Sequence, residues 1–136
     1  MRYVLVLVAV ALTVFAEGPE SESIRGALVQ HEGKPALETA AHKFIFLDGD
    51  EPTMGVLNDK RLAGFDTQAK GHFTAPDRFL VDPIHTRALL VFKDGKAKYV
   101  TYWCDTCSIR YYTPGTCWCC QKETTLDLRD PDQDRY

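Results

Sequence analysis

Residues 24–47 read IRGALVQHEGKPALETAAHKFIFL and show the pattern that organises most of the chain. Short apolar runs alternate here with turn-forming residues such as the HEGK at 31–34. The apolar runs lie at 24–29, 35–39 and 42–47. Short apolar runs at even spacing between turns are typical of a β-barrel or a β-sandwich. We therefore expect a strand in each run, with Phe44 and Phe46 on one face of the third.

The same pattern resumes further along the chain. Candidate strands lie at 65–73, 78–82, 87–92 and 97–103. Asp94 and Gly95 stand between the last two of these runs, and an Asp-Gly pair in that position predicts a tight β-hairpin. The second strand of this hairpin leads directly into the first cysteine.

The segment between the two sets of strands holds the one plausible helix, residues 53–64, TMGVLNDKRLAG. We expect Thr53 to cap its first turn, and Leu57 and Leu62 to face inward. Gly64 stands where a helix often ends with a residue in the left-handed conformation.

Several strands with one short central helix resemble the oligonucleotide/oligosaccharide-binding (OB) fold, a five-stranded barrel. We therefore expect a mainly β protein in which residues 24–103 form a small OB-like β-barrel. The alternative is a different small mixed β-sandwich. Residues 104–136 are expected to form a cysteine metal-binding knuckle and a C-terminal tail.

The chain opens MRYVLVLVAVALTVFA, with one positive charge at Arg2 before an apolar run. This layout is typical of a secretory signal peptide, and the run is shorter than the roughly 20 residues of a membrane-spanning helix. We expect residues 1–16 to be the signal peptide, cleaved after Ala16, and the acidic residues 17–23 to be a flexible arm. The mature protein is then periplasmic or secreted and has no membrane contact.

The charge of the chain argues against nucleic acid as a partner. The formal net charge is -3, and removal of Arg2 with the signal peptide makes it -4. No cluster of lysines or arginines interrupts this balance, whereas a nucleic-acid-binding surface is built from such clusters.

Two C-x-x-C pairs hold most of the chemistry of this sequence. The chain has five cysteines, which are Cys104, Cys107, Cys117, Cys119 and Cys120. Zinc prefers four tetrahedral ligands, and a tight turn between paired cysteines lets both sulfurs face one ion. The Pro114-Gly115 step is a turn signal that directs the second pair toward the first. The spacing predicts a zinc site of Cys104, Cys107, Cys117 and Cys120.

Three alternatives remain open for the thiols. Disulfides suit an exported protein, although an odd number of cysteines cannot all pair within one chain. Cu(I) or another soft metal suits a thiolate cluster in which Cys119 is an additional ligand. Thiol-disulfide redox chemistry is the third alternative, but the thioredoxin motif opens a helix in a βαβ unit, and no such unit is expected here.

The cysteine-rich segment resembles the small heavy-metal-binding domain found beside copper-exporting ATPases and in metal-efflux adaptor proteins. The matching residues are Tyr102, Cys104, Cys107, Ile109 and Arg110, then Pro114, Gly115, Thr116 and Cys117, and finally Cys120. The resemblance implies a metal-binding role. Cys107 stands where the family has histidine, and Gln121 and Lys122 replace its final glycine and methionine. Loss of the soft thioether counts against copper delivery, and four thiolates suit zinc at least as well.

We expect a binding protein rather than an enzyme. A hydrolytic zinc site keeps one coordination position open to water, whereas four cysteines at this spacing close the coordination shell. The aromatic residues around the cysteines are expected to form a hydrophobic collar that docks the knuckle on the barrel. A surface on which a ligand stacks is the alternative role for these aromatic residues.

Overall fold

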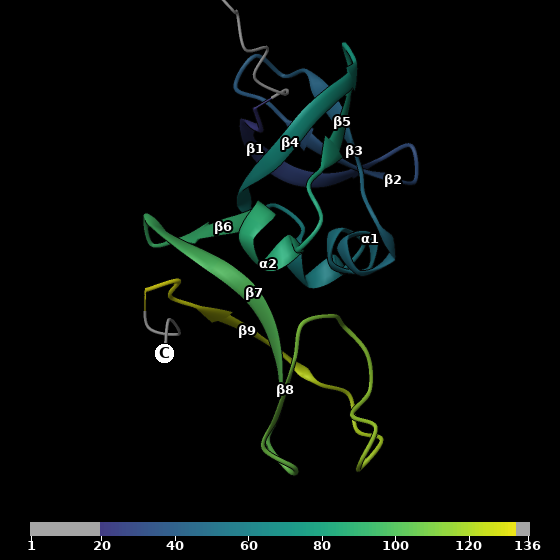
Figure 1. Cartoon of the computed structure of the whole chain (residues 1–136), viewed down its shortest axis with the longest axis vertical. Coiled ribbons are helices and arrows are strands. Elements are labelled where there is room, and N and C mark those ends of the chain that lie inside the picture. Colours follow the sequence, from purple (N-terminus) through teal and green to yellow (C-terminus); the bar gives the residue numbers. More distant parts are fainter. Residues whose placement is uncertain (1–19, 133–136) are drawn as a thin grey trace, which may run out of the picture.

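The computed structural model describes residues 20–132 (Figure 1). The expected signal peptide at 1–16 lies outside these residues. The first strand already begins at Glu22, inside the segment expected to be a flexible arm, because Glu22 pairs with Gly71 of a neighbouring strand. Within residues 20–132, no helix is long and apolar enough to cross a membrane.

The described residues form strands and a few short helices. In chain order they are β1 (Glu22–His31), β2 (Lys34–Glu38), β3 (Phe44–Asp48), α1 (Glu51–Leu57), a 3-10 turn (Lys60–Leu62), β4 (Asp66–Ala75), β5 (Arg78–Val81), α2 (His85–Ala88), β6 (Leu89–Lys93), β7 (Lys96–Cys104), β8 (Ile109–Tyr111) and β9 (Thr125–Arg129). The short helix α2 was not expected from the sequence, which predicts an extended run from Arg87.

Strands β1 to β5 close into a barrel in the order β1-β2-β3-β5-β4, with β4 pairing back onto β1. The β3–β5 pair is parallel and the other pairs are antiparallel. Helix α1 lies between β3 and β4 in the chain. The predicted mainly β fold with a small OB-like barrel is therefore confirmed.

The remaining strands extend from the barrel toward the cysteines. Strand β6 pairs with β4, and the Asp94-Gly95 turn then reverses the chain into β7. Both turn residues have positive φ, 52° and 76°, as a two-residue hairpin turn requires, so the predicted hairpin is confirmed. Strand β7 runs on past β6 and pairs with β8 and β9 instead (Figure 1).

The hydrophobic core extends from the barrel interior to β7. Its buried members include Leu28, Leu37, Leu47, Val56, Leu57, Leu62, Phe79, Val100 and Tyr102. Leu57 and Leu62 face inward as the sequence predicts. Because Val100 and Tyr102 belong to this cluster, β7 is fixed to the barrel as far as Tyr102, two residues before the strand ends at Cys104.

The central helix begins earlier and ends earlier than predicted. Asp50, not Thr53, is the N-cap, because its carboxylate accepts a hydrogen bond from the Thr53 amide at 3.0 Å. Thr53 is instead a buried residue inside the helix. The chain leaves the α-helix at Asn58, and Gly64 takes its predicted positive φ of 86° after the 3-10 turn.

Gly71 is required by the close approach of β4 and β5. A Cβ atom at this position would overlap the carbonyl oxygen of Leu80, which belongs to the backbone and cannot move aside alone. We expect Gly71→Ala to lower the free energy of unfolding by about 1–3 kcal/mol, the usual cost of overpacking. Urea unfolding followed by circular dichroism measures this change.

Gly55→Ala is the matched control. A Cβ atom there meets only the Cδ atom of Pro114 at 3.8 Å, an ordinary contact, and Gly55 lies inside α1. Alanine should therefore stabilise the protein by about 0.5–1 kcal/mol, since glycine is a poor helix former. Equal effects of the two substitutions would contradict the steric explanation for Gly71.

Candidate metal centre

The β7–β8 hairpin presents the first pair of cysteines. Cys104 is the last residue of β7, and the Ser108 amide donates to the Cys104 carbonyl at 2.8 Å. Ser108 has a positive φ of 53°, which turns the chain into β8. This tight turn places Cys107 across from Cys104, so both sulfurs project from one end of the hairpin.

The second pair of cysteines repeats this local geometry. The Gln121 amide donates to the Cys117 carbonyl at 2.7 Å, and Gln121 has a positive φ of 59°. In both turns the amide four residues after the first cysteine closes the loop, and that residue is left-handed. The Cys117 amide also donates to the Lys122 carbonyl at 2.8 Å. Two turns of the same construction therefore present two sulfurs each.

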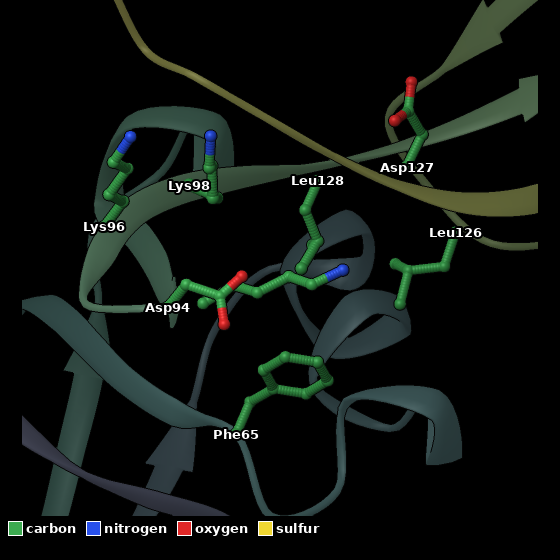
Figure 2. Close-up of a pocket in the computed structure, with 8 residues that line it drawn as sticks. Phe65, Asp94, Lys96, Lys98, Leu126, Asp127 and Leu128 are labelled. Atoms are coloured by element: carbon green, nitrogen blue, oxygen red, sulfur yellow. The ribbon is translucent and has the colours of Figure 1, made fainter.

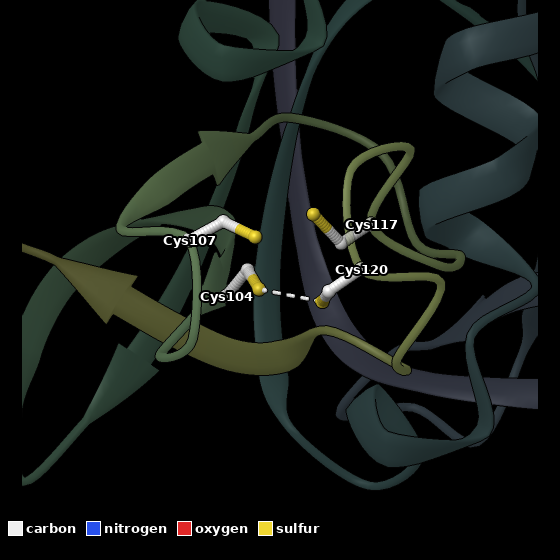
Figure 3. A group of neighbouring side chains, drawn as sticks. All are labelled: Cys104, Cys107, Cys117 and Cys120. Carbon is white, nitrogen blue, oxygen red and sulfur yellow. Dashed lines mark hydrogen bonds between the residues drawn. The ribbon is translucent and has the colours of Figure 1, made fainter.

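The four sulfurs converge on one region of space (Figure 3). The Sγ atoms of Cys104, Cys107, Cys117 and Cys120 all lie within 4.8 Å of one another, and those of Cys104 and Cys120 are 3.5 Å apart. Four sulfurs at 2.3 Å from a tetrahedral zinc ion would be about 3.8 Å apart. The cluster therefore has the size of a four-thiolate metal site, and all of its thiols are free.

Burial differs among the cysteines. Cys104 and Cys117 are buried, with 4% and 0% of their surface exposed, and Cys107 and Cys120 are half-buried. Cys119 is exposed and does not belong to the group of four, although its thiol is close enough to Cys107 to raise the pKa of that residue. The structure therefore brings together the four predicted ligands and leaves the fifth thiol at the surface.

Hydrogen bonds favour the deprotonated form of one cysteine in the cluster, Cys117. The Tyr111 hydroxyl donates to Cys117 Sγ at 3.2 Å and, with the backbone amide of Cys120, lowers the pKa of Cys117 to about 6. The neighbouring thiol of Cys119, together with burial, raises the pKa of Cys107. The lowered pKa of Cys117 favours the thiolate, which is the form that binds a metal, and a bound cation would displace the remaining thiol protons.

A polar junction fixes the cysteine turns to the barrel. The Tyr102 hydroxyl donates to the Asp59 carboxylate at 2.8 Å, and Arg61 forms an ion pair with Asp59 at 3.0 Å. Arg61 also donates to the Thr124 carbonyl at 2.9 Å, directly after the second cysteine turn. This junction links the 3-10 turn, β7 and the chain leaving the cluster.

A second contact holds the loop between the cysteine pairs. Nε2 of the buried His85, in α2, lies 2.6 Å from the Tyr112 carbonyl oxygen. Because a carbonyl only accepts, Nε2 carries the proton of this hydrogen bond. His85 therefore anchors this loop, and it does not belong to the group of four cysteines.

The predicted aromatic collar is only partly present. Tyr102 is fully buried and Tyr111 is packed against the core, as a collar requires. Trp118 and Tyr112, however, are 76% and 49% exposed. These two rings therefore do not pack as a collar requires, and the Trp118 amide is instead held by the Tyr111 hydroxyl.

The junction of Asp59 with Arg61 and Tyr102 should make the free energy of unfolding depend on pH. Burial raises the pKa of Asp59, but hydrogen bonds from Arg61 and Tyr102 outweigh it and hold the pKa below its usual value. The stabilisation is therefore present above the unfolded pKa of about 3.9 and is lost as the pH falls through the lower folded value. Asp59→Asn should lower the free energy of unfolding by about 2 kcal/mol at pH 7, and by less as the pH falls.

Urea unfolding of both proteins between pH 7 and pH 3 checks this prediction. Asp66→Asn is the control, because Asp66 also pairs with an arginine, Arg25, but both side chains are about half exposed, at 47% and 54%. It should change stability little. A pH-independent difference between wild type and Asp59→Asn would contradict the assigned role.

Sequence reasoning missed the residues that support the cluster. Asp59 and Arg61 lie in the segment predicted to be a continuous helix, and no local signal marks them as partners of Tyr102. Tyr111 was recognised only as part of an aromatic group, and its hydroxyl contact to Cys117 follows from the pairing of β7 with β8.

Comparison with known proteins adds no family to this picture. No protein-family model, no curated protein and no solved structure matches the chain. The resemblance to the heavy-metal-binding domain of efflux proteins is thus not supported by a family match. The structure shows a mainly β protein whose β-barrel carries four clustered cysteines able to bind a metal.

Proposed function

We propose that this chain is a non-catalytic, exported metal-binding protein in which one zinc ion is held by the four clustered cysteines. The observation that carries the proposal is the convergence of four sulfurs within 4.8 Å from two turns of the same construction. Zinc, which has no geometric preference from its d-electrons, is commonly bound in this way by four cysteines.

A structural role for the zinc follows from burial. Cys104 and Cys117 are buried, and the Arg61–Thr124 contact fastens the same turns to the barrel. Four thiolates fill the coordination shell and leave no position for water, so the site is suited to stability rather than to hydrolysis. The export proposal rests on the signal-like residues 1–16.

Cu(I) sequestration or delivery is the second candidate. The observation in its favour is the exposed Cys119, whose thiol interacts with Cys107 at the edge of the cluster. An accessible thiolate beside a bound soft metal provides a ligand for transfer to a partner protein. In a zinc protein, by contrast, Cys119 is a free thiol outside the coordination shell.

Metal analysis and thiol counting on one sample test the proposal. Protein purified from its native compartment should contain one zinc per chain. One thiol, Cys119, should react rapidly with a thiol reagent under native conditions, and all five should react after chelation and denaturation. Protein with paired cysteines and no metal would refute the proposal, and one or more copper ions per chain would establish the second candidate.

A further inference from the structure

A pocket with a volume of about 490 Å³ lies beside the β6–β7 hairpin, and none of the five cysteines lines it (Figure 2). Its walls come from this hairpin, from β9 and from Phe65, the residue before β4. Small-molecule sites commonly have volumes of roughly 300–1,000 Å³. The pocket is therefore large enough for a small ligand, and the metal site does not use it.

The floor of the pocket is apolar. Phe65, Leu126 and Leu128 line it, and each is partly buried against the hydrophobic core. Figure 2 shows these three side chains gathered around one space, next to the strand that carries Lys96 and Lys98. Because the core packs behind these residues, the apolar surface they offer is already fixed before a ligand binds.

Three lysines give the pocket its positive charge. Lys93, Lys96 and Lys98 line it, and within residues 20–132 none of them forms an ion pair. Lys96 and Lys98 alternate along β7 with the same parity as the buried Val100 and Tyr102, so they share the core-facing side of the strand. Lys96 and Lys98 therefore lie at the solvent-exposed edge of the hydrophobic core.

Two carboxylates oppose these lysines, but only one is available. Asp127 is already engaged by Arg110 at 2.7 Å and by Arg129 at 3.8 Å. Asp94, in the hairpin turn, is exposed and forms no ion pair within the part of the chain described here. The lining therefore has three lysines against one free carboxylate, and this excess favours an anion.

We propose that this pocket binds a small amphipathic anion, a free medium-chain carboxylate. Its hydrocarbon chain would lie on Phe65, Leu126 and Leu128, where it loses contact with water. Its carboxylate would lie between the ammonium groups of Lys96 and Lys98. This inference is independent of the metal proposal, because the two sites share no lining residue.

Titration of decanoate into the purified protein tests the proposal. Two-dimensional NMR should show shifts at the amides of Phe65, Leu126 and Leu128, and calorimetry gives the affinity. Decanol, which has the same chain and no charge, should bind at least about tenfold more weakly, since it cannot pair with the lysines. The concentrations stay below the micelle limit of decanoate.

Charge variants give effects of opposite sign. Each surface ion pair contributes up to about fivefold in affinity, so Lys96→Gln with Lys98→Gln should weaken decanoate binding about tenfold. Asp94→Asn should strengthen it about two- to fivefold, and asparagine suits the positive φ of 52° at this position. Lys34→Gln, on an exposed lysine in β2 outside the pocket, is the control and should change nothing.

Four results would overturn the proposal. They are equal affinity for decanoate and decanol, shifts away from the pocket, unchanged affinity in the folded lysine variant, and no binding of decanoate. In the last case, binding to anionic vesicles would show that the site recognises a membrane surface instead. Spectra of the variants without ligand show that each is folded.

Discussion

Replacing Cys120 with serine is expected to lower zinc affinity by more than about 100-fold, while Cys119→Ser retains one zinc per chain. Cys120 Sγ lies 3.5 Å from Cys104 Sγ inside the cluster, whereas Cys119 is exposed outside it. Serine offers a hard, protonated oxygen in place of a soft thiolate. Loss of residues that merely support a ligand already costs 10–100-fold, so loss of the ligand itself should cost more.

Metal content and competition with a zinc-sensitive chelator measure this difference. The adjacent Cys119→Ser variant is a close control, because it removes the same atom from the next position in the same turn. Equal loss from the two variants, with copper bound in the wild type, would instead indicate a Cu(I) cluster that uses Cys119. Full zinc retention by Cys120→Ser would refute the four-cysteine site.

Removal of the metal is expected to unfold the cysteine turns and leave the barrel intact. Between residues 105 and 123 only Cys117 is buried, so this segment has almost no apolar core of its own. Zinc binding to comparable cysteine sites contributes about 10–16 kcal/mol, which becomes folding energy for the segment that binds it. Strands β1 to β5 instead pack around Leu37, Leu47 and Phe79, in the barrel part of the hydrophobic core.

Two-dimensional NMR before and after addition of a chelator tests this expectation. Amide signals from residues 105–123 should collapse toward random-coil positions, whereas those of β1 to β5 should keep their dispersion. Re-addition of zinc should restore the original spectrum. Chelator-resistant signals from the cysteine turns in protein without disulfides would contradict a structural metal, and loss of all dispersed signals would contradict an independent barrel.

Much of the local structure could be predicted from the sequence because its signals are local. An Asp-Gly pair readily takes the positive φ angles of a two-residue hairpin turn, and Asp94 and Gly95 do so. The C-x-x-C spacing likewise places two sulfurs on one turn. The inward positions of Leu57 and Leu62 follow from their apolar character. The start of α1 was misplaced because both Asp50 and Thr53 are good N-cap residues, and only the observed hydrogen bond selects Asp50.

The sequence by itself thus determined short strands, their turns and the two C-x-x-C pairs whose four sulfurs cluster. Only the tertiary structure decided the closure of β4 onto β1, the junction of Asp59 with Tyr102 and the lysine-rimmed pocket. The Asp59–Tyr102 hydrogen bond joins residues 43 positions apart, and no local pattern encodes such a pair. Turn and strand preferences act over a few neighbouring residues, whereas these contacts form when segments distant in sequence pack on one core.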